Sequence, residues 1–595
     1  MFELEMDERK KLINSANTCV RDSLKGFIAA NVGLRLIENA NIVVRHDLEE
    51  VKRSNKVTLI SGGGSGHEPA MAGYVGLGML TACVQGEIFT SPPAAVILNC
   101  IRIVAQNNPA GTLVILLNYT GDRLNFGLAV ERAKIEGLLV DTFIVNEDCA
   151  LVSKDKTAGR RGLCGAVLIY KIAGAMAEEG RSLCEIKSAL TRKLSEMGTI
   201  GISLSACSTP SSGKLFKINF DEMELGLGIH GEAGISRLKV CSASEVVHIM
   251  FNHMTREDSA SRLKIASGDH LCLVVNNLGG LSQLEMNIMT KEAVEYLENI
   301  GAVVTRVYCG TFVTSLEMAG VSLTVFKVDK TDLFYLDDHT EASSWIKSFL
   351  PENKVRQTPS LKPVSDFVVS KVSEDFGPKL SPFGCDLFNH ALQTACQAII
   401  SSERQLNELD KEGGDGDCGS TLKRGAEEIL SNLNKFPTLY PKETLFRLAH
   451  CAEMSMGGCS GGLYGLFFTG AAQAFKIDCS PKTWCQAINL GVNMMKKYGE
   501  AEEGDRTMLD ALIPACASLR LHLVNDGNQL DALGAAVKSA ETSAAATAEL
   551  RARAGRASYV NSDLLKSPDP GAHAVGIWMR AVFEGIKQKV KALPK

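Results

Sequence analysis

Leu409-Asp410-Lys411-Glu412-Gly413-Gly414-Asp415-Gly416-Asp417-Cys418-Gly419-Ser420 places three aspartates among glycines, between two stretches with helical periodicity. Carboxylates this close repel one another and raise each other's pKa, so a site that keeps all three ionised normally contains a hard cation. Mg²⁺ is the simplest candidate because it accepts few protein oxygens and leaves its other positions for water and phosphate oxygens. The stretch therefore indicates a metal-dependent nucleotide site.

The same stretch has a simpler interpretation as a turn. Asp-Gly pairs are common turn formers, and Ser420 is a good cap for the helix that follows. An EF-hand is excluded, because the stretch lacks the ligand spacing and the glutamate twelve residues in. Taken alone, these residues leave the turn and the metal site open.

Residues on both sides of this stretch predict an all-α domain. Asp386–Leu409 carries apolar residues at helical spacing, and Thr421–Leu433 repeats that period. Ala532–Leu550 is so rich in alanine that its helix would pack close to a neighbouring backbone, as tight bundles require. Strand signals almost vanish in this half of the chain. We therefore assign residues 381–595 to one helical domain.

The N-terminal half predicts a different fold class. From Asn17 to Asp338, short β-branched runs alternate with longer amphipathic segments, which is the pattern of an α/β fold. Residues 180–202 have helical periodicity between two groups of strands, so we expect two α/β lobes within residues 1–345. Residues 346–380 are polar and interrupted by prolines, which is typical of a solvated linker. The expected strands are Val57–Ser61, Thr112–Asn118, Asp141–Val145, His270–Asn276, Val303–Val307 and Ser322–Val328.

The overall composition describes an enzyme-sized globular chain. Its 595 residues are 45% hydrophobic and carry a net charge of −5 without basic clusters, so we expect no nucleic-acid partner. The N-terminus is acidic, and aliphatic runs such as Leu113–Leu117 are too short to span a bilayer, which predicts a soluble protein with no membrane partner. Eighteen cysteines at irregular spacing favour a reducing compartment, the cytosol.

A second unusual segment lies in the α/β half. Ser61-Gly62-Gly63-Gly64-Ser65-Gly66-His67-Glu68-Pro69 follows an expected strand and has enough glycine for a small ligand to contact the main chain. It is not a Walker A loop, because no Gly-Lys-Ser/Thr follows, and its glycines do not match the dinucleotide-binding spacing. A glycine-rich turn with an incidental histidine is the alternative interpretation.

Two further polar segments contain candidate catalytic residues. Asn118–Asp122 ends an expected strand, where ligands gather in open α/β sheets, so Asp122 would face the loop of His67 and form an acid/base pair with it. The alternative is that Asp122 only closes a turn. Gly226–Gly234 places His230 between glycines, where imidazole can act as a base, a metal ligand or a nucleophile. We find no further ligand set for zinc.

Together, these segments resemble the single-chain, ATP-dependent dihydroxyacetone kinases, and among them the animal triokinase/FMN cyclase branch. The resemblance covers nearly the whole chain and depends on ordered motifs in both halves. In the first half they are Gly62–Pro69, Glu87–Pro92, Asn118–Asp122, Arg160–Gly165 and Gly226–Gly234. In the second half they are Gly414–Gly419, Gly457–Gly465, Gly504–Asp510, Gly555–Tyr559 and Asp569–Gly571.

For the first half, the resemblance implies a substrate-binding K domain. It implies that His230 adds to the carbonyl of dihydroxyacetone or glyceraldehyde to give a hemiaminal, which would fix a small polar ligand that non-covalent contacts hold poorly. His67 and Asp122 correspond to the acid/base pair that deprotonates the terminal hydroxyl. Main-chain contacts with the substrate correspond to Gly64, Ser65 and Gly66.

For the second half, the resemblance implies an L domain, a barrel of antiparallel helices that binds ATP. Asp410, Asp415 and Asp417 correspond to the ligands of Mg²⁺. The animal branch also implies a FAD-AMP lyase (cyclizing) reaction at the same site, with Mn²⁺ or Co²⁺, which converts FAD into AMP and riboflavin cyclic 4′,5′-phosphate. A homodimer, with domains paired within or between subunits, is implied as well. The nucleotide contacts correspond to Asp417, Cys418, Gly419, Cys459, Ser460, Gly499, Thr507, Met508, Arg556, Asp569, Pro570 and Gly571.

Two positions depart from the family. Relatives usually carry lysine directly before the Asn-Tyr-Thr-Gly-Asp run, where it contributes to the substrate site, whereas this chain has Leu117. Losing a cation beside a polar substrate would weaken binding. The smaller departure is Cys459, where related animal sequences carry serine. Two alternatives to the triose kinase therefore stay open: a FAD-AMP lyase with an impaired kinase, and a non-catalytic sugar-binding regulatory protein.

Overall fold

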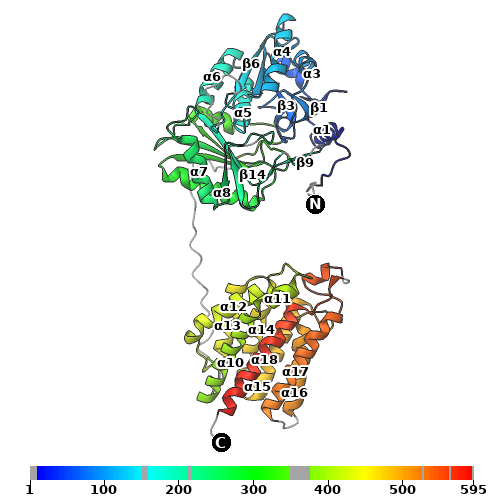
Figure 1. The fold of residues 1–595 in the computed structure, drawn as a ribbon, viewed down its shortest axis with the longest axis vertical. Coiled ribbons are helices and arrows are strands. Elements are labelled where there is room, and N and C mark those ends of the chain that lie inside the picture. The colour runs from blue at the N-terminus through cyan, green and yellow to red at the C-terminus, as the bar shows by residue number, and fades with distance from the viewer. Residues whose placement is uncertain are drawn as a thin grey trace, which may run out of the picture. The chain divides into compact units, whose positions relative to one another are not determined.

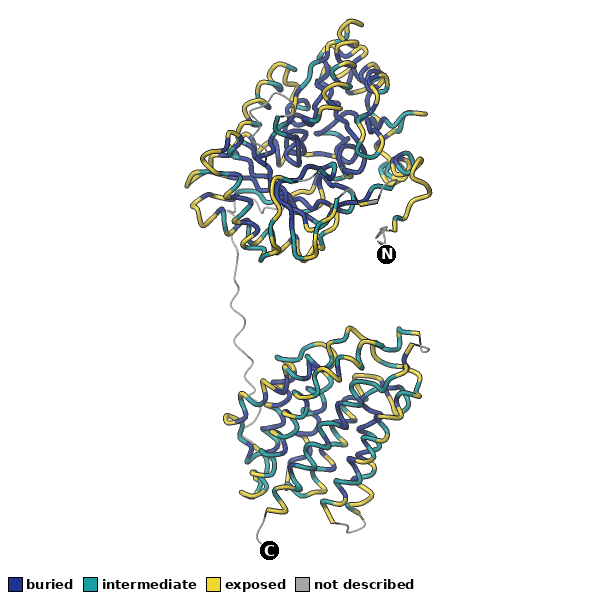
Figure 2. The backbone as a smooth tube through the Cα atoms, viewed as in Figure 1, coloured by how far each residue is buried: buried dark blue, intermediate teal, exposed yellow. Residues whose placement is uncertain are grey.

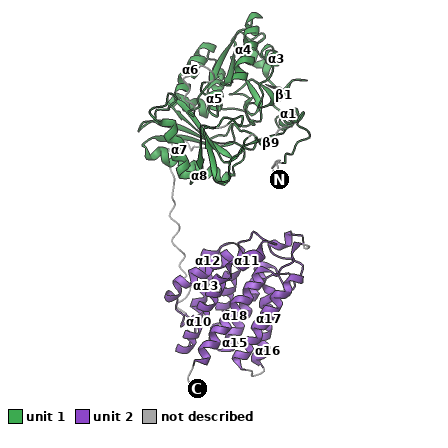
Figure 3. Ribbon diagram, viewed as in Figure 1, with its two compact units in different colours: residues 1–360 green, residues 361–595 purple. Residues whose placement is uncertain are grey.

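The computed structural model describes residues 10–150, 159–210, 213–214, 216–232, 234–348, 376–524, 528–561 and 564–592. The chain divides into two compact units, residues 1–360 and 361–595 (Figure 3). The first is α/β and the second is helical, which confirms the predicted fold class. Residues 349–375, most of the predicted linker, lie outside the described residues, so the boundaries at 345 and 381 stay predictions.

Two six-stranded sheets form the framework of the first unit (Figure 1). The first sheet contains β1 (Leu34–Leu36), β2 (Ile42–Arg45), β3 (Thr58–Ser65), β4 (Ala82–Ile88), β5 (Thr112–Leu117) and β6 (Val140–Val145). Its order is β1-β2-β4-β3-β5-β6, and β3 to β6 run parallel. The second contains β7 (Met197–Ser203), β10 (Glu222–Leu225), β11 (Ser236–Lys239), β12 (His270–Asn277), β13 (Val303–Gly310) and β14 (Gly320–Lys327). Its order is β11-β10-β7-β14-β12-β13, and only β12 and β13 are parallel. Two short strands, β8 (Ser208–Thr209) and β9 (Gly213–Lys214), pair antiparallel in a separate small sheet.

Helices cover both sheets and fill the space between them. They are α1 (Cys19–Ala30), α2 (Leu48–Arg53), α3 (Ala94–Ala105), α4 (Thr120–Ile135), α5 (Gly165–Glu178), α6 (Leu183–Ser195), α7 (Ala243–Thr255), α8 (Gln283–Asn299) and α9 (Lys330–Asp337). Side chains of α3 and α4 pack on one face of the first sheet, and those of α7 and α8 pack on the second. Helix α5 is buried from Gly165 to Ala177, in one hydrophobic cluster with residues of both sheets. The two lobes therefore share a core, visible as the buried centre of this unit (Figure 2).

The predicted strands of this unit are all present, but the helix expected over residues 180–202 is wrong in its last third. Helix α6 ends at Ser195, and Met197–Ser203 forms β7, a central strand buried at every position. A strand buried on both faces has no alternation of apolar and polar residues, so periodicity alone does not separate it from a helix. Strand β4 was missed for the same reason.

The second unit is a closed ring of helices. They are α10 (Pro382–Ser401), α11 (Glu403–Asp410), α12 (Cys418–Asn432), α13 (Pro441–Met456), α14 (Gly458–Ala472), α15 (Pro481–Gly499), α16 (Leu509–Val524), α17 (Gln529–Ala546) and α18 (Pro570–Lys591). From α12 to α18 each helix packs against the next, and α10 closes the ring by contacting α12 and α18. This is the predicted barrel. The single helix expected over Asp386–Leu409 is broken at Ser402 into α10 and α11.

Small side chains allow the barrel to close. In α17, Ala532, Ala536, Ala540 and Ala544 are buried at four-residue spacing, so neighbouring helix backbones come close, as the alanine content predicts. The barrel encloses a cavity of about 1020 Å³ lined mainly by apolar side chains. No helix in the described ranges is long and apolar enough to cross a membrane.

Candidate active site

His67 lies just beyond β3, inside the first unit. Its ring is 1% exposed and stacks on Phe89 with 5.1 Å between ring centroids. Nδ1 lies 2.9 Å from the carbonyl oxygen of Thr314. Because a carbonyl only accepts hydrogen bonds, Nδ1 carries the proton and Nε2 the lone pair. Burial and the neighbouring His230 lower the pKa of His67 to about 3, so the ring is neutral near pH 7. Its Nε2 has no partner in the described part of the chain.

His230, on the loop between β10 and β11, lies edge-on to His67. The ring centroids are 4.9 Å apart, and the ring of Tyr119 lies 4.4 Å from His230 on another side. The side chain of His230 is 23% exposed, whereas His67 is fully enclosed. His230 is therefore the imidazole of this pair that a small ligand reaches first.

An ionised carboxylate holds His230 in place. The backbone N–H of His230 donates to Glu232 Oε2 at 2.8 Å, and its Nδ1 lies 3.9 Å from Glu232 Oε1. Burial acts to raise the pKa of Glu232, but the hydrogen bond and the charge of His230 outweigh it and hold this pKa at about 2. Arg161 lies 3.8 Å from the same carboxylate, and its own partners are Asp148 and the carbonyl of Gly226, both at 2.7 Å. This chain of charges fixes the loop that carries His230.

Asp122 lies in the first turn of α4, 6% exposed. Burial raises its pKa to about 6, although the hydroxyl of Ser91, which donates to Oδ1 at 2.5 Å, and the charge of His230 act in the opposite direction. No hydrogen bond joins Asp122 to His67 among the described residues. The carbonyl of Thr314, and not Asp122, therefore holds the tautomer of His67.

The glycine-rich segment approaches these side chains as part of a strand. Strand β3 continues through Ser65, so the loop expected from Ser61 onward begins later. A Cβ on Gly64 would lie 2.7 Å from the amide nitrogen of Thr90, and one on Gly63 would lie 3.5 Å from Asp122 Oδ2. Gly64 thus has a packing reason, close approach of the segment that carries Thr90, whereas a Cβ on Gly63 would meet Asp122 only at ordinary contact distance. The substrate contacts expected of Gly64 and Gly66 stay predictions. The hydroxyl of Ser65 donates to the carbonyl of Gly86 at 2.7 Å.

Leu117, the departure from the family, is a core residue. It ends β5, is 2% exposed and belongs to the hydrophobic cluster that includes Val145, Leu163 and Ile229. A Cβ on Gly162 would lie 2.9 Å from its Cβ, so the space beside this position is tightly filled. Leucine here fills space where the family resemblance expects a cation.

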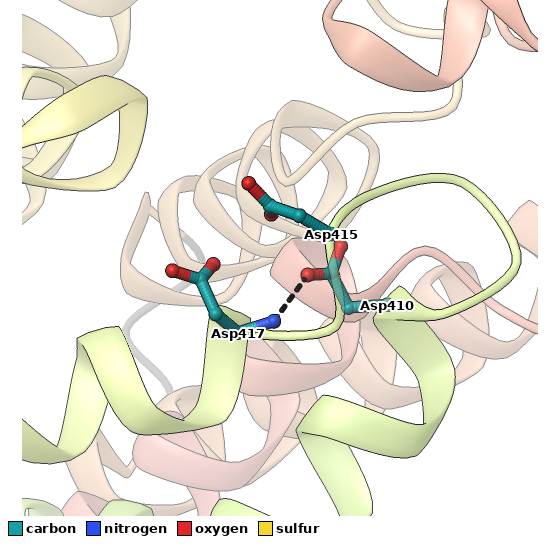
Figure 4. A group of neighbouring side chains, drawn as sticks. All are labelled: Asp410, Asp415 and Asp417. Atoms are coloured by element: carbon teal, nitrogen blue, oxygen red, sulfur yellow. Dashed lines mark hydrogen bonds between the residues drawn. The ribbon is translucent and has the colours of Figure 1, made fainter. Parts of the chain in front are cut away.

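The second unit brings the three aspartates together at the junction of α11 and α12 (Figure 4). One carboxylate oxygen of each of Asp410, Asp415 and Asp417 lies within 4.8 Å of the others. Asp410 Oδ2 accepts from the backbone N–H of Asp417 at 3.0 Å and of Cys418 at 3.2 Å. The arrangement offers hard oxygen donors at one point, which fits Mg²⁺ or a similar divalent cation.

The conformation of the loop around these carboxylates requires glycine at two positions. A Cβ on Gly414 would lie 2.3 Å from Asp410 Oδ1, so only glycine lets that carboxylate lie against the loop. Gly416 has φ of 75°, a conformation that side chains disfavour. Arg556 forms an ion pair with Asp415, and this hydrogen bond lowers the pKa of the Asp415 carboxyl. The guanidinium thus favours the ionised form of this carboxylate in the absence of a metal ion.

The residues expected to contact the nucleotide gather at helix ends around this loop. Cys418 and Gly419 begin α12, and Cys459 and Ser460 lie in the first turn of α14. Thr507 and Met508 precede α16, and Asp569 caps α18, where it accepts from Ala572 N at 2.8 Å. Helix N-termini favour phosphate through free N–H groups and the helix dipole. Gly571 lies beside Met508, Arg556 beside Asp415, and Gly499 at the end of α15.

Several polar residues of these sites escaped the sequence interpretation. Glu232 and Tyr119 lie inside the quoted motifs, so their position alone could have suggested them. Thr314 is 247 residues from His67 along the chain, and no local pattern links the two. In the second unit, burial raises the pKa of Asp569 to about 6, with Arg506 opposing, and neither effect is visible in the sequence.

Comparisons with known proteins cover both units. Residues 25–344 match the Dak1 domain family, and residues 412–584 match the DAK2 domain family. Triokinase/FMN cyclase from Homo sapiens is 44% identical over 579 residues, spanning 97% of this chain and 99% of that protein. Dihydroxyacetone kinase 1 from Saccharomyces cerevisiae is 34% identical over 595 residues, 95% of this chain and 98% of the relative.

Solved structures give the same picture. The native dihydroxyacetone kinase of C. freundii superposes with a TM-score of 0.64 at 34% identity, covering 97% of this chain and 99% of that one. The same kinase in complex with AMP-PNP and Mg²⁺ gives a TM-score of 0.63 at 33% identity, with equal coverage. The likeness thus extends over both units and their order in the chain.

Proposed function

Because this chain belongs to the dihydroxyacetone kinase family, with a Dak1 domain followed by a DAK2 domain, we propose that it phosphorylates dihydroxyacetone and glyceraldehyde with ATP. It also acts as a FAD-AMP lyase (cyclizing) that converts FAD into AMP and riboflavin cyclic 4′,5′-phosphate. The observation that carries both activities is the meeting of Asp410, Asp415 and Asp417 within 4.8 Å, beside helix ends that suit a nucleotide. Both reactions need that centre, whereas only the kinase needs His230.

The second unit provides the nucleotide site. The carboxylates of Asp410, Asp415 and Asp417, which come within 4.8 Å of one another, would hold Mg²⁺ for the kinase and Mn²⁺ or Co²⁺ for FAD cleavage. When bound, the cation offsets the charge of the phosphates. The chain itself orients Asp410 through the N–H groups of Asp417 and Cys418, and the N-termini of α12 and α14 offer further N–H groups to phosphate oxygens.

The first unit binds the triose through its carbonyl. The ring nitrogen of His230 that bears the lone pair adds to the carbonyl carbon as the C=O π bond breaks. The carbonyl oxygen takes up a proton and the other ring nitrogen releases its proton, which leaves a neutral hemiaminal. Glu232, fixed by Arg161, sets the orientation of the imidazole for this addition. A polyol such as glycerol has no carbonyl and is not trapped. Gly64, Ser65 and Gly66 line the same site.

Asp122 is better suited than His67 to be the general base. A base is most effective when its pKa lies near the working pH, and Asp122 has a pKa of about 6 against about 3 for His67. Asp122 takes the proton of the terminal hydroxyl, whose oxygen attacks the γ-phosphorus as the bond to ADP breaks. His67 stays neutral and offers Nε2 as an acceptor that orients the substrate.

Leu117 favours a second candidate, a FAD-AMP lyase whose kinase activity is impaired. Its side chain is buried in the core, so the site lacks the cation that the family resemblance expects there. In this candidate, the second unit still cleaves FAD, and only the affinity of the first unit for the triose is reduced. A non-catalytic sugar-binding regulatory protein is disfavoured, since both histidines and all three aspartates are present.

Two assays on the purified chain separate these candidates. The first supplies ATP, Mg²⁺ and dihydroxyacetone or glyceraldehyde, and the second supplies FAD with Mn²⁺ or Co²⁺. We expect turnover in both. Turnover of FAD alone would favour the impaired kinase, and Leu117→Lys would then be tested for rescue of triose phosphorylation. Absence of turnover in both assays would reject the enzymatic proposal.

Two wider features belong to the same proposal. The homodimer implied by the resemblance would be rejected by scattering that gave a fully active monomer. A cytosolic location is supported by the eighteen cysteines, all of which are free thiols. Imaging of the tagged full chain tests it.

A further inference from the structure

Three loops of the second unit meet at Ser567. Its backbone N–H and its hydroxyl each donate to the carboxylate of Glu412 at 2.8 Å, and the N–H of Lys566 donates to the same carboxylate at 2.9 Å. On the other side, Nη2 of Arg506 donates to the carbonyl oxygen of Ser567 at 2.7 Å. Every backbone polar group of Ser567, and its hydroxyl, is therefore held by a charged side chain from another loop.

The positions of these residues in the chain make the contact informative. Glu412 lies between Asp410 and Asp415, on the loop that carries the metal-binding carboxylates. Arg506 directly precedes Thr507, and Ser567 is two residues before Asp569, so these loops carry expected nucleotide contacts. One set of hydrogen bonds thus joins the metal loop to two nucleotide loops. We call Glu412, Arg506 and Ser567 the Ser567 clamp.

Arg506 has features that folding alone does not favour. It is 2% exposed, and its Nε has no hydrogen-bond partner among the residues described. Its backbone is left-handed, with φ of 62°, a conformation that is unfavourable for a residue other than glycine. Burying a guanidinium with an unpaired donor costs more. Features that cost stability gather at functional sites, where they preorganise the groups that bind a ligand.

We propose that Glu412 and Arg506 are positioning residues that hold the aspartate loop in register with the nucleotide loops through Ser567. The proposal depends on the proposed function of this site. Without the clamp the loops would have to become ordered as MgATP binds, and that ordering would weaken nucleotide binding. Binding of the triose, in the first unit, would not change.

Glu412→Ala tests the proposal in the full chain. We expect the KM for MgATP to rise about tenfold, with the KM for dihydroxyacetone unchanged, and Glu412→Gln to recover part of the loss because its oxygen still accepts one hydrogen bond. Glu408→Ala is the matched control, since Glu408 lies nearby on α11 and pairs with Lys411 on the surface. The control is expected to keep both KM values.

A double variant distinguishes the clamp from independent effects. The hydroxyl of Ser567 acts through Glu412, so Ser567→Ala added to Glu412→Ala is expected to raise the KM for MgATP no further. Independent, multiplying effects of the two substitutions would overturn the proposal. So would equal rises in the KM for both substrates, which would indicate general damage.

Amide hydrogen exchange separates this proposal from the proposed function. Glu412→Ala is expected to speed exchange at Lys566 and Ser567 in the intact chain, whatever reaction the protein catalyses. Unchanged exchange there would reject the clamp even if the chain is an active kinase. A third outcome is faster exchange in Glu412→Ala together with no turnover of triose or FAD by the unaltered chain. This result would show that Glu412 makes these hydrogen bonds, but it would reject both the positioning role and the proposed function.

Discussion

The two candidate sites of this chain differ in how far their side chains are exposed to water. In the first unit, His67 and Asp122 are buried, their pKa values are displaced by burial, and aromatic rings pack around His230. In the second unit, Asp415 and Asp417 are exposed, and Asp415 is kept ionised by a surface arginine. One site is enclosed and preformed, and the other is open and acidic.

The difference follows from what each site would bind. A triose is small and polar, so a site that selects it must exclude water and place a reactive nitrogen and a base at fixed positions. A divalent cation with a nucleotide brings its own charge and needs carboxylates that remain ionised in its absence. The buried site therefore depends on packing, while the open site depends on hydrogen bonds between loops.

The largest expected effect separates the two sites by chemistry. His230→Ala removes the proposed carbonyl trap, so triose phosphorylation is expected to fall by about 10³-fold or more. FAD cleavage, which uses the second unit, is expected to stay within about twofold of the unaltered chain. Steady-state assays of both reactions measure this, with His46→Ala at an exposed position as the control. Equal loss of both activities would contradict the division between the units.

Asp415→Asn is the converse test, because both proposed reactions use the aspartates. Replacing one carboxylate with a neutral amide weakens the hold on a hard cation, and we expect both activities to fall by about 10²-fold. Raising the Mg²⁺ or Mn²⁺ concentration should restore part of each. Asp386→Asn serves as the control, since Asp386 is paired with Lys589 on the surface of the same unit. Loss of triose phosphorylation alone would argue against a shared centre.

Leu117→Ala asks whether this departure is part of the core. Removing a buried leucine leaves a cavity, so the free energy of unfolding of the first unit is expected to fall by about 2–5 kcal/mol. The unfolding transition of the second unit should not move. Denaturant unfolding measures the free energy of unfolding, and scanning calorimetry follows the transitions of the two units. Leu124→Ala is the control, because that leucine is 68% exposed. Unchanged stability combined with an altered KM for the triose would place Leu117 in the site instead.

The smallest expected effect concerns the pH dependence of the enclosed site. Asp122 works as a base only when deprotonated, so kcat for triose phosphorylation is expected to decline as pH falls below about 6. The hydroxyl of Ser91 lowers that pKa, so Ser91→Ala should raise it and move the decline to higher pH, by less than about one unit. The pH profile of FAD cleavage should not shift, and movement of both profiles together would reject this assignment.

Much of the architecture could be read from local patterns. The helical period and the alanine content of the C-terminal half are properties of short windows, and they predict helices such as α12 and α17. Strands with β-branched runs, such as β5, were equally visible. Strand β7 was not, because a strand buried on both faces, next to β10 and β14, has no periodicity that separates it from a helix.

The candidate sites were predictable to a smaller extent. The aspartates are neighbours in sequence, so their meeting requires only one turn of the chain. The partners that set protonation are not neighbours. Thr314 fixes the tautomer of His67, Ser91 tunes Asp122, and Arg161 supports the loop of His230 through Glu232. Each of these contacts joins segments that only the folded sheets bring together.

The amino-acid sequence by itself determined the order of an α/β unit and a helical unit and the acidic loop between α11 and α12, and it predicted the residues at which a ligand would react. Tertiary structure alone decided which of these residues are buried, which ring nitrogen of His67 carries the proton, and that Glu412 and Arg506 meet at Ser567. The physical reason is the distance along the chain over which each effect acts. Periodicity and turn chemistry act over a few residues, whereas burial and hydrogen bonding depend on atoms that are distant in the chain and close only after folding.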